Sequence, residues 1–274
     1  MSIVDLHLHT TASDGTWPPE FLYAYIAASN IAFFSVTDHD TMDAYPVPPQ
    51  LAPRVIPGME VDTVHEGKTV HILTYGISPD SPLLERLREQ RVARASRMQD
   101  TVDRLNALGI EVTIDDIRAH APRAVSLGRP HAAQALVSRG VVATIQEAFD
   151  RYLAEGAPAY VPLDRLSSRE GIRLMHESGG IAVVAHPLRL KEPRVLDDLR
   201  EEGVDGIEVL HPTTGPDDRE RLRDYADRYR LLVTGGTDFH RPAGAAPGVE
   251  LARRDIERLQ QRLARLHARV AVSS

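Results

Sequence analysis

Seven short apolar stretches most constrain how this chain can fold, because helical patterns alternate with several of them along the sequence. The stretches are rich in β-branched residues, which is typical of buried strands. They lie at 3–9, 32–37, 54–61, 69–75, 181–186, 206–210 and 231–235. Strands that alternate with helices in this way predict an α/β architecture.

The middle of the chain departs from this alternation. Residues 81–157 carry helix patterns at 83–108, 129–138 and 144–154, each followed closely by a glycine, and no convincing strand pattern. We therefore expect a barrel in two parts, 1–80 and 158–274, with a helical insertion at 81–157.

Composition excludes several classes of protein. The chain of 274 residues is 42% hydrophobic, too much for a disordered protein, and no apolar run approaches the roughly 20 residues of a membrane span. The first residues show no secretory signal, so we expect a cytoplasmic protein without membrane association. The absence of cysteine removes disulfides, thiolate metal sites and cysteine nucleophiles. A formal net charge of −7 argues against a surface that coats nucleic acid broadly.

Two histidines lie on the first expected strand. His7 and His9 alternate with Leu6 and Leu8, so the two-residue period of a strand places both imidazoles on one face. Buried imidazoles need partners. The pair is therefore either a hydrogen-bonded pair in the core or part of a metal site.

Nearly every other expected strand also ends in a histidine or a carboxylate. These residues are Asp38, His39, Asp40, Glu60, His71, His186, Glu208, His211, Asp238 and His240. In a β/α barrel the carboxyl ends of the strands converge on one face, where such barrels carry their chemistry. The pattern therefore predicts one shared site.

Imidazoles and carboxylates are ligands that suit Zn, Mn or Fe(II). Even six histidines and three carboxylates exceed what one tetrahedral ion can use, whereas two or three ions with bridging ligands would account for them. Clustered divalent ions indicate hydrolysis, usually of a phosphate ester, by an activated water.

These motifs resemble the PHP (polymerase and histidinol phosphatase) family along essentially the whole chain. The matching motifs are His7-Leu8-His9, Ser13-Asp14-Gly15, Thr37-Asp38-His39-Asp40, Gly58-Met59-Glu60, His71, Ala185-His186-Pro187 and Gly236-Thr237-Asp238-Phe239-His240. Within the family, Leu127-Gly128-Arg129-Pro130-His131 resembles the branch of 3′,5′-nucleoside bisphosphate phosphatases and 5′→3′ exoribonucleases.

The resemblance implies a distorted seven-stranded β/α (TIM-like) barrel with two to three divalent ions of Mn, Fe or Zn. The first ion would be held by His7, His9 and Asp238, with Glu60 bridging it to the third. The second ion would be held by Asp14, His39 and His240. His71 and His186 would complete the third.

The resemblance also implies substrate contacts in the insertion, which would cover the metals. Ser126 and Arg129 would bind phosphate, since the planar guanidinium suits a phosphate, although Arg129 could instead cap or pair with the next helix. His131 is a candidate for contact with the scissile phosphate, or for a supporting histidine.

Two more candidates lie in the second part of the barrel. Arg189 is a further anion-binding residue, although Leu188 replaces the glycine expected before it, and 161–163 lacks a basic residue that relatives show nearby. His211 could protonate the leaving oxygen, bind substrate or serve only the structure. We expect the other histidines, His65, His120, His176 and His267, on the surface.

The function implied is hydrolysis of the 3′-phosphoester of 5′-phosphorylated nucleotides. A nucleoside 3′,5′-bisphosphate would give a 5′-monophosphate and phosphate, and a short 5′-phosphorylated RNA would be shortened from its 5′ end. The alternatives are a histidinol-phosphate-type phosphatase and a metal-binding accessory protein without turnover. We see no sign of an obligate protein partner. The arginine-rich helix 83–108 is a solvated or substrate-facing helix, or guides RNA.

Overall fold

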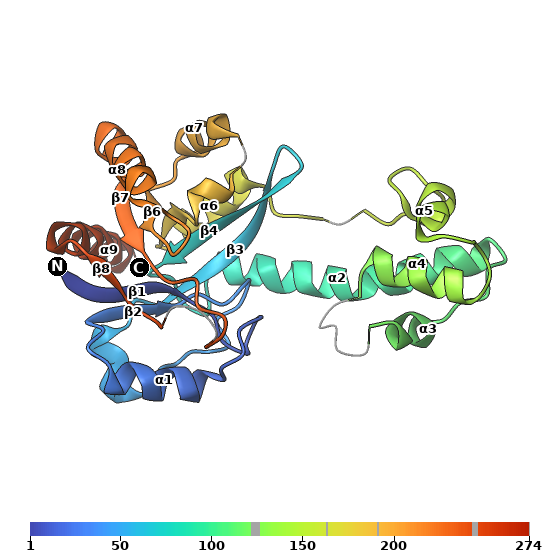
Figure 1. Cartoon of the computed structure of the whole chain (residues 1–274), viewed down its shortest axis with the longest axis horizontal. Coiled ribbons are helices and arrows are strands. Elements are labelled where there is room, and N and C mark those ends of the chain that lie inside the picture. The colour runs from blue at the N-terminus through green and yellow to red at the C-terminus, as the bar shows by residue number, and fades with distance from the viewer. Residues whose placement is uncertain (122–126, 163, 191, 243–245, 274) are drawn as a thin grey trace. The chain divides into compact units, whose positions relative to one another are not determined.

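The computed structural model describes residues 1–121, 127–162, 164–190, 192–242 and 246–273 (Figure 1). The chain divides into two compact units. The first consists of Met1–Leu87 and Leu166–Ser274, and the second of Arg88–Arg165.

The first unit is a mixed α/β fold with two sheets, in the strand orders β2-β1-β8 and β3-β4-β5-β6-β7. The smaller sheet contains β1 (Ser2–Leu8), β2 (Phe33–Val36) and β8 (Val249–Leu251). The larger contains β3 (Gly58–His65), β4 (Lys68–Tyr75), β5 (Ile181–Val184), β6 (Gly206–Leu210) and β7 (Leu232–Gly235). Parallel pairing joins β1 to β2 and links β5, β6 and β7.

The closed seven-stranded barrel is not confirmed. The described residues form eight strands in two separate sheets, which isolated parallel bridges link at Leu8–Phe239, Phe34–Val55 and His39–Glu60. The strand that the sequence did not predict is β8, which pairs antiparallel with β1. Its three residues are too few to show a period.

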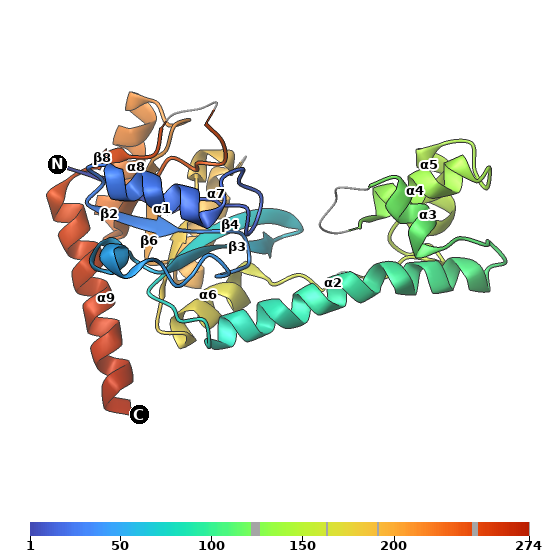
Figure 2. The ribbon, with the colours of Figure 1, turned by 90° about the horizontal axis from the view of Figure 1, so that it is seen from below.

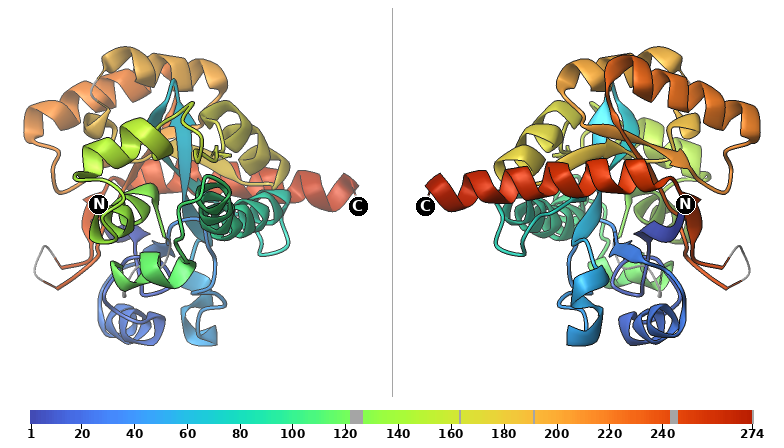
Figure 3. Two further views of the ribbon diagram at one scale, coloured as in Figure 1. Left: turned by 90° about the vertical axis from the view of Figure 1, so that its right-hand side faces the viewer. Right: turned by 90° about the vertical axis from the view of Figure 1, so that its left-hand side faces the viewer.

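Helices cover the strands of the first unit (Figures 1 and 2). They are α1 (Pro19–Ala28), α6 (Ser168–Glu177), α7 (Pro193–Glu202), α8 (Pro216–Tyr229) and α9 (Arg253–Ser273). In the right view of Figure 3, α9 runs between α8 above it and α1 below it. The expected start of α6 is confirmed, since the Ser167 hydroxyl accepts from the Glu170 N–H.

The core of this unit lies between strands and helices. Its main apolar cluster includes fully buried residues of both sheets, such as Leu6, Ile72 and Val183. The Tyr75 hydroxyl also donates to the Leu6 carbonyl oxygen at 2.8 Å, so one buried side chain connects the two sheets.

In the second unit, the described residues form helices and no strand. The unit contains most of α2 (Pro82–Ala107), then α3 (Ile114–Ala119), α4 (Arg129–Ser138), α5 (Ile145–Ala148) and a π-helix (Phe149–Leu153). It has a separate apolar core that includes Leu105, Ile117, Leu136 and Leu153.

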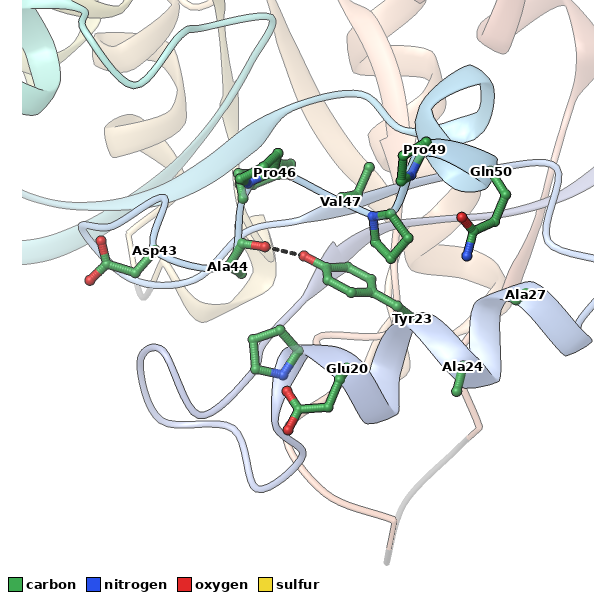
Figure 4. Close-up of a pocket in the computed structure, with 13 residues that line it drawn as sticks. Glu20, Tyr23, Ala24, Ala27, Asp43, Ala44, Pro46, Val47, Pro49 and Gln50 are labelled. Carbon is green, nitrogen blue, oxygen red and sulfur yellow. Dashed lines mark hydrogen bonds between the residues drawn. The ribbon is translucent and has the colours of Figure 1, made fainter.

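A cavity of about 640 Å³ lies between α1 and the proline-rich segment 43–50 (Figure 4). Its lining is mostly proline and alanine, with Glu20 and Asp43 as the charged members. The Tyr23 hydroxyl donates to the Ala44 carbonyl oxygen across it. No histidine lines this cavity, so the titratable cluster predicted from the sequence lies elsewhere. Within the described residues, no helix is long and apolar enough to cross a membrane.

Candidate metal centre

The structure brings the nine residues expected as metal ligands together where the strands of the first unit end. They form overlapping groups whose ligand atoms lie within 4.8 Å of one another. The groups are His7, His9, Glu60 and Asp238; His9, Asp14, His39 and His240; Glu60, His71 and His186; and a further group of His39, Asp62 and His71. The sets inferred from the sequence recur in the first three groups.

The first strand places His7 and His9 on one face, with ring centroids 5.1 Å apart and both side chains fully buried. His7 has a carboxylate on each side, since Nδ1 lies 3.0 Å from Glu208 Oε1 and Nε2 lies 3.1 Å from Glu60 Oε2. Neither ring nitrogen of His9 makes a hydrogen bond, although Nε2 lies 3.1 Å from Glu60 Oε2. A buried imidazole without a hydrogen bond, facing carboxylates, fits a metal ligand.

The loop after β1 carries Asp14 back toward the histidines. The Asp38 carboxylate holds this loop by accepting from the Thr10 N–H, the Thr10 hydroxyl and the Ser13 hydroxyl at 2.7, 2.7 and 2.6 Å. Gly15 is required here, because a Cβ would lie 2.6 Å from the carbonyl carbon of His9.

Glu60 lies at the middle of the cluster. Its Oε2 is 3.1 Å from Nε2 of both His7 and His9, and its Oε1 is 3.0 Å from His71 Nδ1 and 3.1 Å from His186 Nε2. A carboxylate with different histidines at its two oxygens has the arrangement of a bridging ligand.

Two of the expected ligands, His186 and Asp238, lie at positions with a positive backbone φ angle. His186 and Asp238 have φ angles of 29° and 51°, in a region that non-glycine residues rarely adopt. The Glu208 carboxylate holds the first of these by accepting from the His186 N–H at 2.8 Å. His240 stacks on His9 with ring centroids 4.1 Å apart, and its Nε2 lies 3.2 Å from Asp14 Oδ2.

The carboxylates of the cluster are held in their charged form. Burial would raise the pKa of Glu60, but the charge of His7 and hydrogen bonds from His186, His7 and His71 hold it well below its usual range. The hydrogen bond from His240 lowers the pKa of Asp14 to about 2. Burial opposes protonation of His39, yet its hydrogen bond to Asp62 and the charge of Glu60 raise its pKa to about 9. The carboxylates therefore draw cations, and divalent ions would replace protons on the imidazoles.

Three carboxylates support the cluster without having been assigned as metal ligands from the sequence. The Asp62 carboxylate lies 3.0 Å from His39 Nδ1 and 3.5 Å from His71 Nε2. Asp5 is fully buried and accepts from the Thr237 N–H and hydroxyl, and burial raises its pKa to about 6. The third is Glu208, whose carboxylate contacts His7 Nδ1 and accepts from the His186 N–H. Asp5 and Asp62 lie two residues from His7 and Glu60, so the strand period could have placed each on the same face as a ligand.

Arg189 and His211 also lie at the cluster. The Arg189 guanidinium donates to Asp238 Oδ2 at 2.8 Å and its side chain is 52% exposed. His211 is buried, with Nε2 3.3 Å from Asp238 Oδ2 and Nδ1 2.7 Å from the Thr213 hydroxyl oxygen. Both side chains therefore share one carboxylate oxygen.

The remaining candidates belong to the second unit, apart from Ser126, which lies outside the described residues. The Arg129 guanidinium donates to the Leu153 carbonyl oxygen at 3.2 Å and lies 5.1 Å from the centroid of the Tyr160 ring. His131 Nδ1 accepts from the Gly128 N–H at 3.1 Å, which satisfies the start of α4.

The expectation that His65 lies on the surface is wrong. It is the last residue of β3 and its side chain is 10% exposed, with ring nitrogens 3.1 Å from the Ser168 hydroxyl oxygen and 3.3 Å from Asp198 Oδ2. The β3 strand begins at Gly58 and extends past the expected end at residue 61 because it pairs with β4 along its whole length. His120 is exposed and His176 is 39% exposed, whereas the side chain of His267 is outside the described residues.

Comparison with known proteins gives relatives along most of the chain, although no family model matches it. It is 33% identical to the 5′-3′ exoribonuclease Rnm of Escherichia coli, over 92% of this chain and 89% of the relative. It is 34% identical to the 3′,5′-nucleoside bisphosphate phosphatase of Chromobacterium violaceum, over 88% of each chain. It is 32% identical to the phosphoribosyl 1,2-cyclic phosphate 1,2-diphosphodiesterase of Eggerthella lenta, over 90% of this chain and 97% of the relative.

Solved structures are also similar to this chain along most of its length. A protein of Bifidobacterium adolescentis described as a metal-dependent phosphoesterase has a TM-score of 0.63 and 31% identity, over 94% of this chain and 95% of that one. An amidohydrolase of Chromobacterium violaceum, with bound sulfate and no metal, has a TM-score of 0.65 and 30% identity over 94% and 96% of the two chains.

Proposed function

The chain belongs to the PHP family of metal-dependent phosphoesterases, and from this we propose that it hydrolyses the 3′-phosphoester of 5′-phosphorylated nucleotides. The relatives named as exoribonuclease and as bisphosphate phosphatase support this substrate class. The chain is thus a phosphoester hydrolase whose substrates would be nucleoside 3′,5′-bisphosphates, short 5′-phosphorylated RNA, or both.

The observation that carries the proposal is the cluster around Glu60, where His9 is buried without a hydrogen bond among carboxylates. His7, His9 and Asp238 would hold one divalent ion, Asp14, His39 and His240 a second, and His71 and His186 a third, with Glu60 bridging the first and third. When bound, such ions supply positive charge for the phosphoryl oxygens and activate a water for attack.

Arg189 would orient the substrate. It uses one nitrogen on Asp238, which leaves other guanidinium donors for a phosphoryl oxygen. His211 would hold the proton that the leaving oxygen needs, because Thr213 engages Nδ1 and leaves Nε2 directed at the cluster.

The insertion would bind the other end of the substrate. Arg129, His131 and Ser126 are proposed to contact the 5′-phosphate or the scissile phosphate. The contacts of Arg129 with Leu153 and Tyr160 support a fixed guanidinium, which is favourable for anion binding because little side-chain freedom is then lost.

We also propose that the two sheets act as one distorted barrel of seven strands around this centre, with β8 outside it. The bridges at Leu8–Phe239 and His39–Glu60 support this, since they join the sheets next to the ligands.

A second candidate activity is hydrolysis of a cyclic phosphate on ribose. The relative named as a phosphoribosyl 1,2-cyclic phosphate diphosphodiesterase favours it, and the same attack on phosphorus would open the ring.

The test is product identification with purified protein and Mn²⁺. The panel contains adenosine 3′,5′-bisphosphate, a 5′-phosphorylated oligoribonucleotide, a ribose cyclic phosphate and histidinol phosphate. We expect adenosine 5′-monophosphate from the first and 5′-mononucleotides from the second. Turnover of histidinol phosphate alone, or none at all in metal-loaded protein, would reject the proposal.

A further inference from the structure

A second pocket, which is lined mainly by polar residues, lies at the ends of the strands opposite to the metal centre. It has a volume of about 460 Å³ and is lined by the two residues before β6, the start of β7, the end of α8 and one face of α9. Its charged members are Asp205, Arg230, Arg258, Arg262 and Arg265. The α9 helix packs against β7 and runs below α8 in the right view of Figure 3.

The positive charge of this pocket is largely uncompensated. Arg262 pairs with Asp205 Oδ1 at 2.7 Å, and Asp205 is the single carboxylate of the lining. Arg258 donates to the carbonyl oxygens of Arg230 and Leu231 at 3.5 and 3.3 Å, which leaves its charge unpaired. Arg230 and Arg265 have no ion-pair partner among the described residues.

The guanidinium groups on α9 lie close enough to repel one another when no anion is bound. Arg258, Arg262 and Arg265 follow one another at spacings of four and three on α9, so they share a face of the helix, where like charges repel. The chain as a whole carries a formal net charge of −7, so the pocket and the whole molecule have net charges of opposite sign.

We propose that this pocket binds a small ligand carrying two or more linked phosphate groups, either inorganic pyrophosphate or the phosphate tail of a nucleoside diphosphate or triphosphate. The guanidinium fork binds phosphate oxygens in pairs, and arginines from two elements face a space within the usual range of small-molecule sites. The guanidinium groups of Arg230, Arg258 and Arg265 together offer more N–H donors than one phosphate group can accept, which favours a ligand with linked phosphates. The proposal does not depend on the phosphoesterase activity, because the metal ligands lie at the other ends of the strands.

The test compares the metal-loaded wild type with an R230N/R265Q variant by calorimetric titration of pyrophosphate, adenosine diphosphate and adenosine. Arg230 has a φ of 57°, which asparagine tolerates, and Arg265 is exposed on α9. The matched control is R253Q on the same helix, where Arg253 pairs with Glu257 outside the pocket. The metal centre also attracts phosphates, so the number of ligands bound per chain is the readout.

We expect two pyrophosphates per wild-type or R253Q chain and one per double-variant chain, or a second affinity at least about tenfold weaker. The kcat and KM for a bisphosphate substrate should stay unchanged in the double variant, which separates this result from failure of the proposed function. Tighter binding of adenosine diphosphate than of pyrophosphate would identify the nucleotide as the ligand, and equal binding would identify the phosphates alone.

Two outcomes would overturn the proposal: identical binding by wild type and double variant, or an equal loss in R253Q. Single-stranded RNA that displaces pyrophosphate at far lower concentrations would assign the pocket to nucleic acid instead, and would also overturn it. If the double variant does not fold, R265Q alone provides the test, with a loss of about fivefold expected from one guanidinium.

Discussion

At the scale of single residues, Asp62 shows how a side chain can act on metal ligands from outside their set. Its carboxylate lies against ring nitrogens of both His39 and His71, and such partners fix the orientation of a ligating imidazole and raise its basicity. We predict that Asp62→Asn lowers metal content and reduces kcat by about 10- to 100-fold. Elemental analysis and steady-state kinetics measure both, with Asp224→Asn on the exposed surface of α8 as the control. Full metal content and unchanged kcat would show that Asp62 has no such role.

His9 gives a sharper prediction, because its buried nitrogens make no hydrogen bond. His9→Ala should lose most metal and all measurable phosphoesterase turnover while keeping its fold. Circular dichroism checks the fold and a product assay the turnover. Turnover at the level of the wild type would contradict the placement of the reaction at this cluster.

Gly236 tests how tightly the cluster is packed. A Cβ at this position would lie 2.4 Å from the His7 Cβ, so Gly236→Ala should push β7 and β1 apart. We expect a loss of about 1–3 kcal/mol in the free energy of unfolding, the usual range for overpacking. Gly215→Ala is the matched control, since its nearest neighbour, Asp218 Oδ2, would be 3.8 Å away. Urea denaturation of both variants measures the difference, and equal stability would contradict the close approach.

At the scale of elements, Asp205 joins three of them. It accepts from the Ala182 N–H of β5 at 3.0 Å, and its oxygens lie 2.7 Å from His176 Nε2 on α6 and from Arg262 on α9. Burial would raise the pKa of Asp205, but the hydrogen bonds from His176 and the Ala182 N–H outweigh it and lower this pKa.

A depressed carboxyl pKa means that folding favours the charged form. The stabilisation is therefore complete above the unfolded value of 3.8 and is lost as the pH falls below it through the folded pKa. We predict that Asp205→Asn destabilises the protein at pH 7 and that its penalty shrinks between about pH 4 and pH 2. Unfolding free energies across that range test this, with Asp224→Asn as the reference. A penalty independent of pH would show that the charge of Asp205 does not matter.

The sequence predicts strands and helices well where the pattern of apolar residues matches the residues that are buried, and poorly where it does not. The buried strands β5, β6 and β7 are found with their ends nearly correct, because their apolar runs are continuous. The β3 strand lies four residues later than expected, since Asp62, Thr63 and His65 interrupt the apolar pattern while pairing with β4 extends the strand. The α7 helix was not expected, since six of its ten residues are charged.

The candidate site could be anticipated because its residues lie at strand ends, where neighbouring strands necessarily meet. The strand period could have placed Asp62 on the face of Glu60, but its contacts with His39 and His71 could not be predicted, because they depend on how β2 and β4 lie beside β3. His65 was misplaced for a related reason: packing of α6 and α7 over the end of β3, which buries it, cannot be read from one strand alone.

At the scale of the whole molecule, metal binding should contribute to folding. The ligands come from segments throughout the first unit, so ions that bind the folded chain more tightly than the unfolded one stabilise it by mass action. We predict that chelation lowers the melting temperature by several degrees and that Mn²⁺ restores it. Thermal unfolding of wild type and His9→Ala measures this. A variant that responds to chelation as strongly as the wild type would contradict the assignment of His9 as a ligand.

The location of the ligands along the chain has a consequence for protein synthesis. His7 and His9 leave the ribosome early, whereas Asp238 and His240 follow more than 220 positions later by the printed numbering. A nascent chain therefore exposes His7 and His9 long before Asp238 and His240 exist, and a product that stops short of residue 238 holds an incomplete set. The complete ligand set, and with it the hydrolytic activity, would then appear only after translation of nearly the whole first unit.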